Sequence, residues 1–102
     1  MSQAALRDLF HEVEKYVSPL INRNSATPGQ LSREENRILA LQQINRLNQR
    51  IGQLARASQT TMQDFIIVQK MVNNLTVGVK SDNVPQMKYA FSSLRNYMSS
   101  FD

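Results

Sequence analysis

The feature that most constrains this chain is a helical pattern without proline that begins near Arg33 and continues to Leu75. Apolar residues recur in it every three or four positions, the spacing of one face of an α-helix. An unbroken helix of that length would be about 65 Å long, whereas a compact chain of this size has a radius of gyration of about 13 Å. Either the helix breaks, or a partner covers the projecting part, as in a coiled coil. Ser58–Thr61 is the predicted break, because Ser and Thr form helices poorly but cap them well.

Two shorter amphipathic patterns flank the long one. The first covers residues 3–22, and Pro19 should kink or end this helix because it lacks an N–H. The last begins at Pro85, which suits the first turn of a helix, and its stripe continues to the end of the chain. The predicted fold is all-α: one domain over residues 1–102, an antiparallel bundle of three to four amphipathic helices. The long central helix covers approximately 33–76 if it is unbroken, and otherwise the helices span approximately 3–22, 33–57, 60–76 and 84–100.

The segment 23–32 is predicted to be a flexible loop, since it is rich in Asn, Ser, Pro and Gly. Two residues compete to restart the helix after it. Thr27 is followed by Pro28, a favourable first helical residue. Ser32 has a glutamate, Glu35, three positions later, which makes a capping box. The capping box is the stronger signal and predicts a helix that begins at residue 33.

A β-hairpin over Phe65–Val79 is the structural alternative. Runs of β-branched residues flank Asn73–Asn74, and such a pair favours a turn. The strongly helical flanks favour a helix instead. In the helical version Gly78 lies near the C-terminal end of the third helix, with residues 78–83 as the connection to the next helix. Thr60 with Gln63 forms a second capping box.

The apolar stripe of the long pattern is expected to face the core or a partner helix. Its members are Ile38, Leu41, Ile44, Leu47, Ile51, Leu54 and Ala55, followed by Met62, Phe65, Ile66, Val72 and Leu75.

The positive charge is concentrated in one segment. The net charge is +4, from 12 basic and 8 acidic residues. No acidic residue lies between Asn36 and Gln63, so this segment alone accounts for the net charge. A basic segment attracts nucleic acid, an anionic membrane or an acidic protein. Its arginines are Arg37, Arg46, Arg50 and Arg56.

Arg46 and Arg50 lie one helical turn apart, among several glutamines. Like charges at this spacing repel each other, and an anionic partner would relieve the repulsion. Arginine with Asn and Gln can bind phosphates and read base edges. However, no aromatic residue lies between Tyr16 and Phe65, so the basic segment has no platform of its own for stacking bases.

Enzymatic chemistry has little support in the sequence. There is no cysteine and only one histidine, His11, so thiolate and multi-histidine metal sites are excluded. His11 is interpreted as a surface residue, and Asp8 and Glu12 as a solvated face beside Lys15. We therefore expect no catalytic residue, no cofactor and no metal.

The sequence favours a non-enzymatic helical interaction protein, such as an adaptor, a chaperone or an assembly subunit. Self-association, most simply as a dimer, would cover the long stripes, and an acidic protein is a second possible partner. Nucleic-acid binding through residues 37–56 is the alternative function. No membrane span and no secretory signal are recognisable, so a cytoplasmic location is expected. The candidate partner-binding residues are Arg46, Arg50, Arg56, Ile44, Ile51, Tyr89 and Tyr97.

Overall fold

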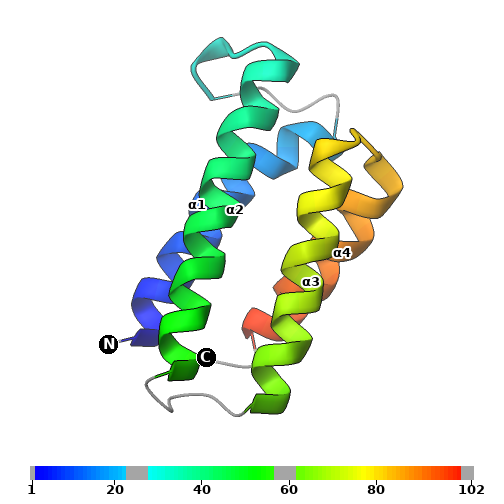
Figure 1. Ribbon diagram of the computed structural model, residues 1–102. Coiled ribbons are helices and arrows are strands. Elements are labelled where there is room, and N and C mark those ends of the chain that lie inside the picture. Colours follow the sequence, from blue (N-terminus) through cyan, green and yellow to red (C-terminus); the bar gives the residue numbers. More distant parts are fainter. Residues whose placement is uncertain (1, 23–27, 57–61, 100–102) are drawn as a thin grey trace.

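The computed structural model describes residues 2–22, 28–56 and 62–99, and their regular structure is entirely helical, with no strand (Figure 1). The prediction of an all-α fold is therefore confirmed. Pro85 lies in the first turn of the last helix, as expected. The elements are α1 (Ser2–Ile21), the short 3-10 turn η1 (Pro28–Gln30), α2 (Arg33–Arg56), α3 (Met62–Lys80) and α4 (Val84–Ser99).

The helices pack as neighbours in a compact bundle. In Figure 1, α2 lies beside α3, with α1 behind α2 and α4 behind α3. Contacts join α1 to α2, α2 to α3, α3 to α4 and α4 to α1. The longest dimension is 39 Å and the radius of gyration is 13.3 Å. The predicted break at Ser58–Thr61, the capping box at Thr60 and residues 23–27 of the predicted 23–32 loop lie outside the described residues.

The hairpin alternative for residues 65–79 is wrong, because α3 covers the whole segment. Its buried residues recur every three or four positions, the period of a helix and not of a strand. They are Val68, Val72, Leu75 and Val79.

Residues of all four helices form a single hydrophobic core. The apolar stripe expected for the long helical pattern is wrong at two positions. Ile38 is 49% exposed and Ile66 is 45% exposed. On α2 the buried face instead begins at Asn36 and Ala40, and two residues on a helix correspond to a rotation of about 200°. Ile38 therefore points away from the core. The buried apolar residues are Phe10, Val13, Val17, Leu20, Ala40, Ile44, Leu47, Ile51, Val68, Val72, Leu75, Val79, Met87, Ala90, Phe91, Leu94 and Met98.

The capping box at the start of α2 is confirmed. The backbone N–H of Glu35 donates to Ser32 Oγ at 3.2 Å, and the N–H of Ser32 donates to Glu35 Oε1 at 3.1 Å. These two bonds satisfy amides that have no partner within the helix. They fix the beginning of α2 at Arg33.

The first turn of α2 also binds the C-terminal part of α1. Asn36, which is fully buried, donates from Nδ2 to the carbonyl of Tyr16 at 2.5 Å. Arg33 donates from Nη2 to the carbonyl of Leu20 at 3.1 Å. Leu20 is one of the last four residues of α1, whose carbonyls lack partners within the helix. α1 continues two residues beyond Pro19, where the sequence predicted a kink or an end.

The same part of α2 binds the end of α3. Arg37 donates from Nε to the carbonyl of Val79 at 2.9 Å and from Nη2 to the carbonyl of Lys80 at 2.5 Å. Its Nη1 lies 2.8 Å from a carboxylate oxygen of Glu34. A cation on the terminal carbonyls of a helix is favoured by hydrogen bonding and by the helix dipole. Arg37 thus ties α2 to α3.

The turn between α3 and α4 is held by a third contact from α2. The N–H groups of Asp82 and Asn83 donate to the carbonyls of Val79 and Gly78, at 3.2 and 2.8 Å. This is a Schellman motif, and Asp82 has the left-handed φ of 52° that it requires. The Asp82 carboxylate accepts hydrogen bonds from Arg33 Nη2 at 2.6 Å and from Arg33 Nε at 3.1 and 3.2 Å. These bonds raise the pKa of Arg33 above its usual value.

Gly78 lies near the C-terminal end of α3, as the sequence predicts, although the helix continues two residues further, to Lys80. The absence of a side chain at Gly78 permits the close approach of α4. A Cβ atom at Gly78 would lie 3.0 Å from the backbone nitrogen of Met87 and 3.3 Å from its Cα. Distances this short to backbone atoms require the two helices to separate.

The close approach at Gly78 predicts opposite effects for two alanine substitutions. Gly78→Ala should lower the free energy of unfolding by about 1–3 kcal/mol, because α4 must shift. Gly52→Ala is the matched control in α2, where a Cβ would meet only Arg56 Nη1 at an ordinary 3.5 Å. It should raise the free energy of unfolding by up to about 1 kcal/mol, through helix propensity. Urea denaturation measures both, and equal effects of the two substitutions would contradict the packing assigned to Gly78.

The capping box predicts a pH dependence of stability. Hydrogen bonds from the backbone and side chain of Ser32 lower the pKa of the Glu35 carboxyl. A carboxyl with a lowered pKa in the folded state stabilises the protein above its unfolded-state pKa, and this contribution is lost as the pH falls through the folded-state value. Glu35→Gln keeps a capping-box residue that does not ionise.

Wild type should therefore be more stable than Glu35→Gln at neutral pH, and the difference should shrink on acidification. Thermal melting of both proteins between neutral and acid pH tests this. A difference that stays constant with pH would show that the Glu35 charge does not contribute.

Candidate functional site

The seven residues predicted to bind a partner lie in different environments. Ile44 and Ile51 are buried in the core, with 1% and 4% exposure. Tyr97 is half-buried against the core, and Tyr89 is 74% exposed on α4. Ile44 and Ile51 therefore stabilise the bundle itself, and their side chains are not exposed to a partner in the folded chain.

Arg46 and Arg50 each lie beside a glutamine of α2. Arg46 Nη1 is 3.5 Å from Gln43 Oε1, and Arg50 Nη1 is 3.1 Å from Gln53 Oε1. Arg46 is exposed, whereas Arg50 is only partly exposed and its Nε is buried. Neither arginine forms an ion pair within the described residues. Their charges are available to an anionic partner, that of Arg46 most openly.

Arg56 belongs to a different site. It is six residues beyond Arg50, which corresponds to about 120° around the helix. It lines a groove of about 390 Å³ between α2 and α3. We call this the α2–α3 groove, and its residues are Asn48, Gln49, Gly52, Gln53, Arg56, Phe65 and Gln69.

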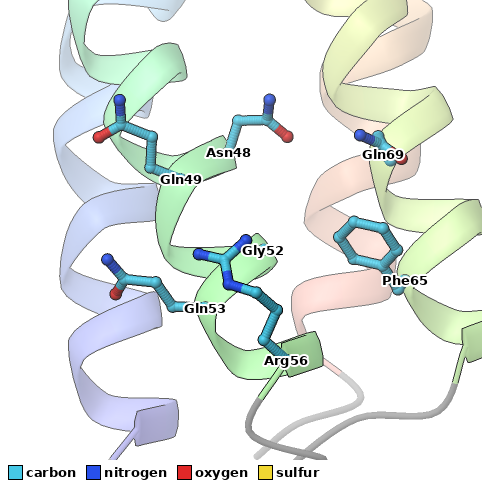
Figure 2. A pocket seen from close by; sticks show the side chains of 7 residues that line it. All are labelled: Asn48, Gln49, Gly52, Gln53, Arg56, Phe65 and Gln69. Carbon is cyan, nitrogen blue, oxygen red and sulfur yellow. The ribbon is translucent and has the colours of Figure 1, made fainter.

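Figure 2 shows how the lining of the α2–α3 groove is arranged. Asn48 extends from α2 toward α3, and Phe65 and Gln69 extend from α3 toward α2. The Arg56 guanidinium folds back over Gly52. Because Gly52 has no side chain, this position leaves space for the guanidinium. One cation, one aromatic ring and two amides thus converge on one open volume.

Phe65 lines the α2–α3 groove, a position that the sequence does not predict. The sequence has no aromatic residue within the basic segment. Packing of α3 against α2 brings the Phe65 ring to the same groove as Arg56. No local signal predicts this pairing, because it depends on how the two helices lie against each other.

A second groove, of about 370 Å³, lies between α1 and α4. Its cation Arg95 is 2.6 Å from a carboxylate oxygen of Glu14 and lies 5.0 Å from the centre of the Phe91 ring. The Arg95 charge is therefore already matched. The lining residues are Ser18, Ile21, Asn22, Lys88, Phe91, Ser92 and Arg95.

The surface of α2 and α3 combines exposed apolar residues with a basic charge balance. Between Asn36 and Ser81 there are six basic residues and one acidic residue, Asp64. Arg37 binds carbonyls of α3 and pairs with Glu34, so its charge is already matched within the protein. We call the exposed set the α2–α3 outer face: Ile38, Asn45, Gln49 and Arg56 on one side of α2, and Ile66, Lys70, Asn73 and Val77 on one side of α3.

The polar residues of α1 make ordinary surface contacts. His11 is exposed, and its Nδ1 lies 3.5 Å from Glu14. Glu12 pairs with Lys15 at 3.6 Å, in line with the solvated face expected for this helix. Nowhere in residues 2–22, 28–56 and 62–99 do three or more side chains of His, Cys, Asp or Glu gather as a metal site would need. None of the helices in this part of the chain is both long and apolar enough to cross a bilayer.

Comparison of the chain with protein-family models, with curated proteins and with solved structures gives no match. The site must therefore be interpreted from its own chemistry.

Proposed function

We propose that this chain is a non-enzymatic helical interaction protein that binds an acidic protein through the α2–α3 outer face. The observation that carries the proposal is the exposure of three large aliphatic side chains on this face. Ile38, Ile66 and Val77 are 45–52% exposed and are surrounded by amide and basic residues. Exposed apolar groups that are rimmed by polar ones are typical of interaction sites. The basic balance of α2 and α3 favours an acidic partner.

The proposal includes the arrangement of the helices. The first turn of α2 contacts carbonyls of Leu20 near the end of α1 and of Val79 at the end of α3. These contacts support an antiparallel bundle in which the chain reverses between α2 and α3 at Ser58–Thr61. A chain without cysteine also needs no oxidising compartment, which supports the cytoplasmic location.

Affinity purification of the tagged chain from its native cells, with nuclease treatment, tests the function. We expect a defined protein to co-purify with wild type. Ile66→Asp should abolish its retention by placing a negative charge against an acidic partner. Arg46→Glu with Arg50→Glu should slow its association, because rim charges act mainly on the encounter.

Lys88→Glu is the matched control for the charge changes, since it alters an exposed lysine on α4. It should leave the complex intact. Circular dichroism should show an unchanged helix content for each variant. Retention of the same protein by Ile66→Asp would contradict the proposed face, and a complex that nuclease destroys would favour nucleic acid instead.

Self-association remains part of the proposal, but the structural reason for it is no longer a projecting helix. The sequence argument depended on a projecting helix, whereas α2 and α3 lie side by side in a bundle 39 Å long. A second copy could cover Ile66 and Val77, but it would also bring two copies of Lys70 and Arg56 together. Repulsion between these charges should weaken as salt is added.

We therefore expect light scattering to give the mass of one chain, 11.7 kDa, at low salt and a rising mass at high salt. A dimer that is stable at low salt would show that a different surface mediates self-association.

Nucleic-acid binding is the second candidate function. It is favoured by one specific observation, the position of Phe65 in the same groove as Arg56. This pairing supplies the aromatic ring that the basic segment lacks.

A further inference from the structure

Three of the polar side chains that line the α2–α3 groove have no partner among the residues that the structure describes. Arg56, Asn48 and Gln69 make no hydrogen bond or ion pair to any residue that the structure describes. A primary amide offers two donors and an acceptor with two lone pairs, and a guanidinium offers five donors. Among the described residues, the groove therefore contains strong hydrogen-bonding groups that no other side chain or carbonyl binds.

The positive charge of Arg56 in the groove favours a negatively charged ligand. Arg56 is its only ionisable lining residue, and no carboxylate lies among the lining residues. In the α1–α4 groove, by contrast, Glu14 lies 2.6 Å from Arg95. An anion would therefore meet no like charge among the described lining residues of the α2–α3 groove.

The Phe65 ring adds a preference for a flat ligand. It is half-buried against the core on one side and extends toward α2 on the other (Figure 2). Nucleobases stack on rings held in this way, largely independently of sequence. The volume of about 390 Å³ lies within the range of small-ligand pockets, roughly 300–1,000 Å³.

We propose that the α2–α3 groove binds a nucleotide unit, a base that carries a phosphate. The phosphate is bound by the Arg56 guanidinium, which matches phosphate oxygens with two parallel N–H groups. The base stacks on Phe65, and the amides of Asn48 and Gln69 bind its edge. This inference rests on the second candidate function and names the residues that would perform it. Its two possible sources are a free nucleotide and a single-stranded nucleic acid.

Fluorescence anisotropy with a labelled oligothymidine of about ten nucleotides tests the site in the full chain. Phe65→Leu should weaken binding by about 5- to 100-fold, the range found when a stacked base loses its aromatic partner. Arg56→Gln should weaken it by a factor of the same order, as expected when hydrogen bonds from a charged group are lost. Arg56→Gln should also flatten the dependence of log K on log salt by about 0.7, the value for one phosphate of a single strand.

Arg46→Gln is the matched control, because it removes the same charge from the same helix ten residues away. It should weaken binding by less than about threefold. Phe65→Leu keeps an apolar residue against the core, and thermal melting should confirm that each variant is folded.

Competition with thymidine monophosphate identifies the source of the ligand. Displacement at a similar concentration of nucleotide units indicates a free nucleotide, whereas displacement only at a large excess indicates a strand. Both outcomes support the proposed chemistry.

Two results overturn the inference. The first is the absence of binding at the highest protein concentration. The second is equal weakening by Arg56→Gln and Arg46→Gln with no effect of Phe65→Leu, which would indicate general electrostatic attraction. That second result would leave nucleic-acid binding standing as a function while removing the groove as its site.

Discussion

The first turn of α2 holds the bundle together at one end. Arg37 binds the last carbonyls of α3, Arg33 binds a carbonyl of α1 and the Asp82 carboxylate, and the buried Asn36 binds the carbonyl of Tyr16. The carbonyls of Leu20 and Lys80 lie at helix ends and have no partner within the helix, so Arg33 and Arg37 bind groups that would otherwise require water. Three neighbouring side chains thereby fix α1, α3 and the α3–α4 turn relative to α2.

Because these contacts use only the first residues of α2, the arginines of the basic segment have different roles. Arg37 is used to hold the helices together, whereas Arg46 and Arg56 lie farther along α2 and are not needed there. The α2–α3 groove lies beyond the middle of α2, away from the end that the arginine contacts fix. A fixed end and an open groove on the same pair of helices let the chain present Arg56 and Phe65 without weakening the contacts that define the fold.

Local patterns in the sequence predict much of this fold. The four helices follow from 3.6-residue periodicity, and the start of α2 follows from the Ser32–Glu35 pair. The pattern is wrong at Ile38, because the polar Asn36, which binds a carbonyl of α1, occupies the buried face in this turn and Ile38 lies on the opposite side of the helix. Gly78 lies near the end of α3, as predicted, and also permits contact with Met87. The site is predictable only in part: the arginines of α2 are evident, but the approach of Phe65 to Arg56 arises from packing between two helices.

Arg37 stabilises the bundle by binding the carbonyls of α3, and a comparison of two variants tests this contribution most directly. Chemical denaturation should show that Arg37→Gln lowers the free energy of unfolding by about 1–3 kcal/mol, as expected for hydrogen bonds from a charged group. Arg46→Gln, the same change at an exposed position of the same helix, should alter it by less than about 0.5 kcal/mol. Equal stabilities of the two variants would contradict the account.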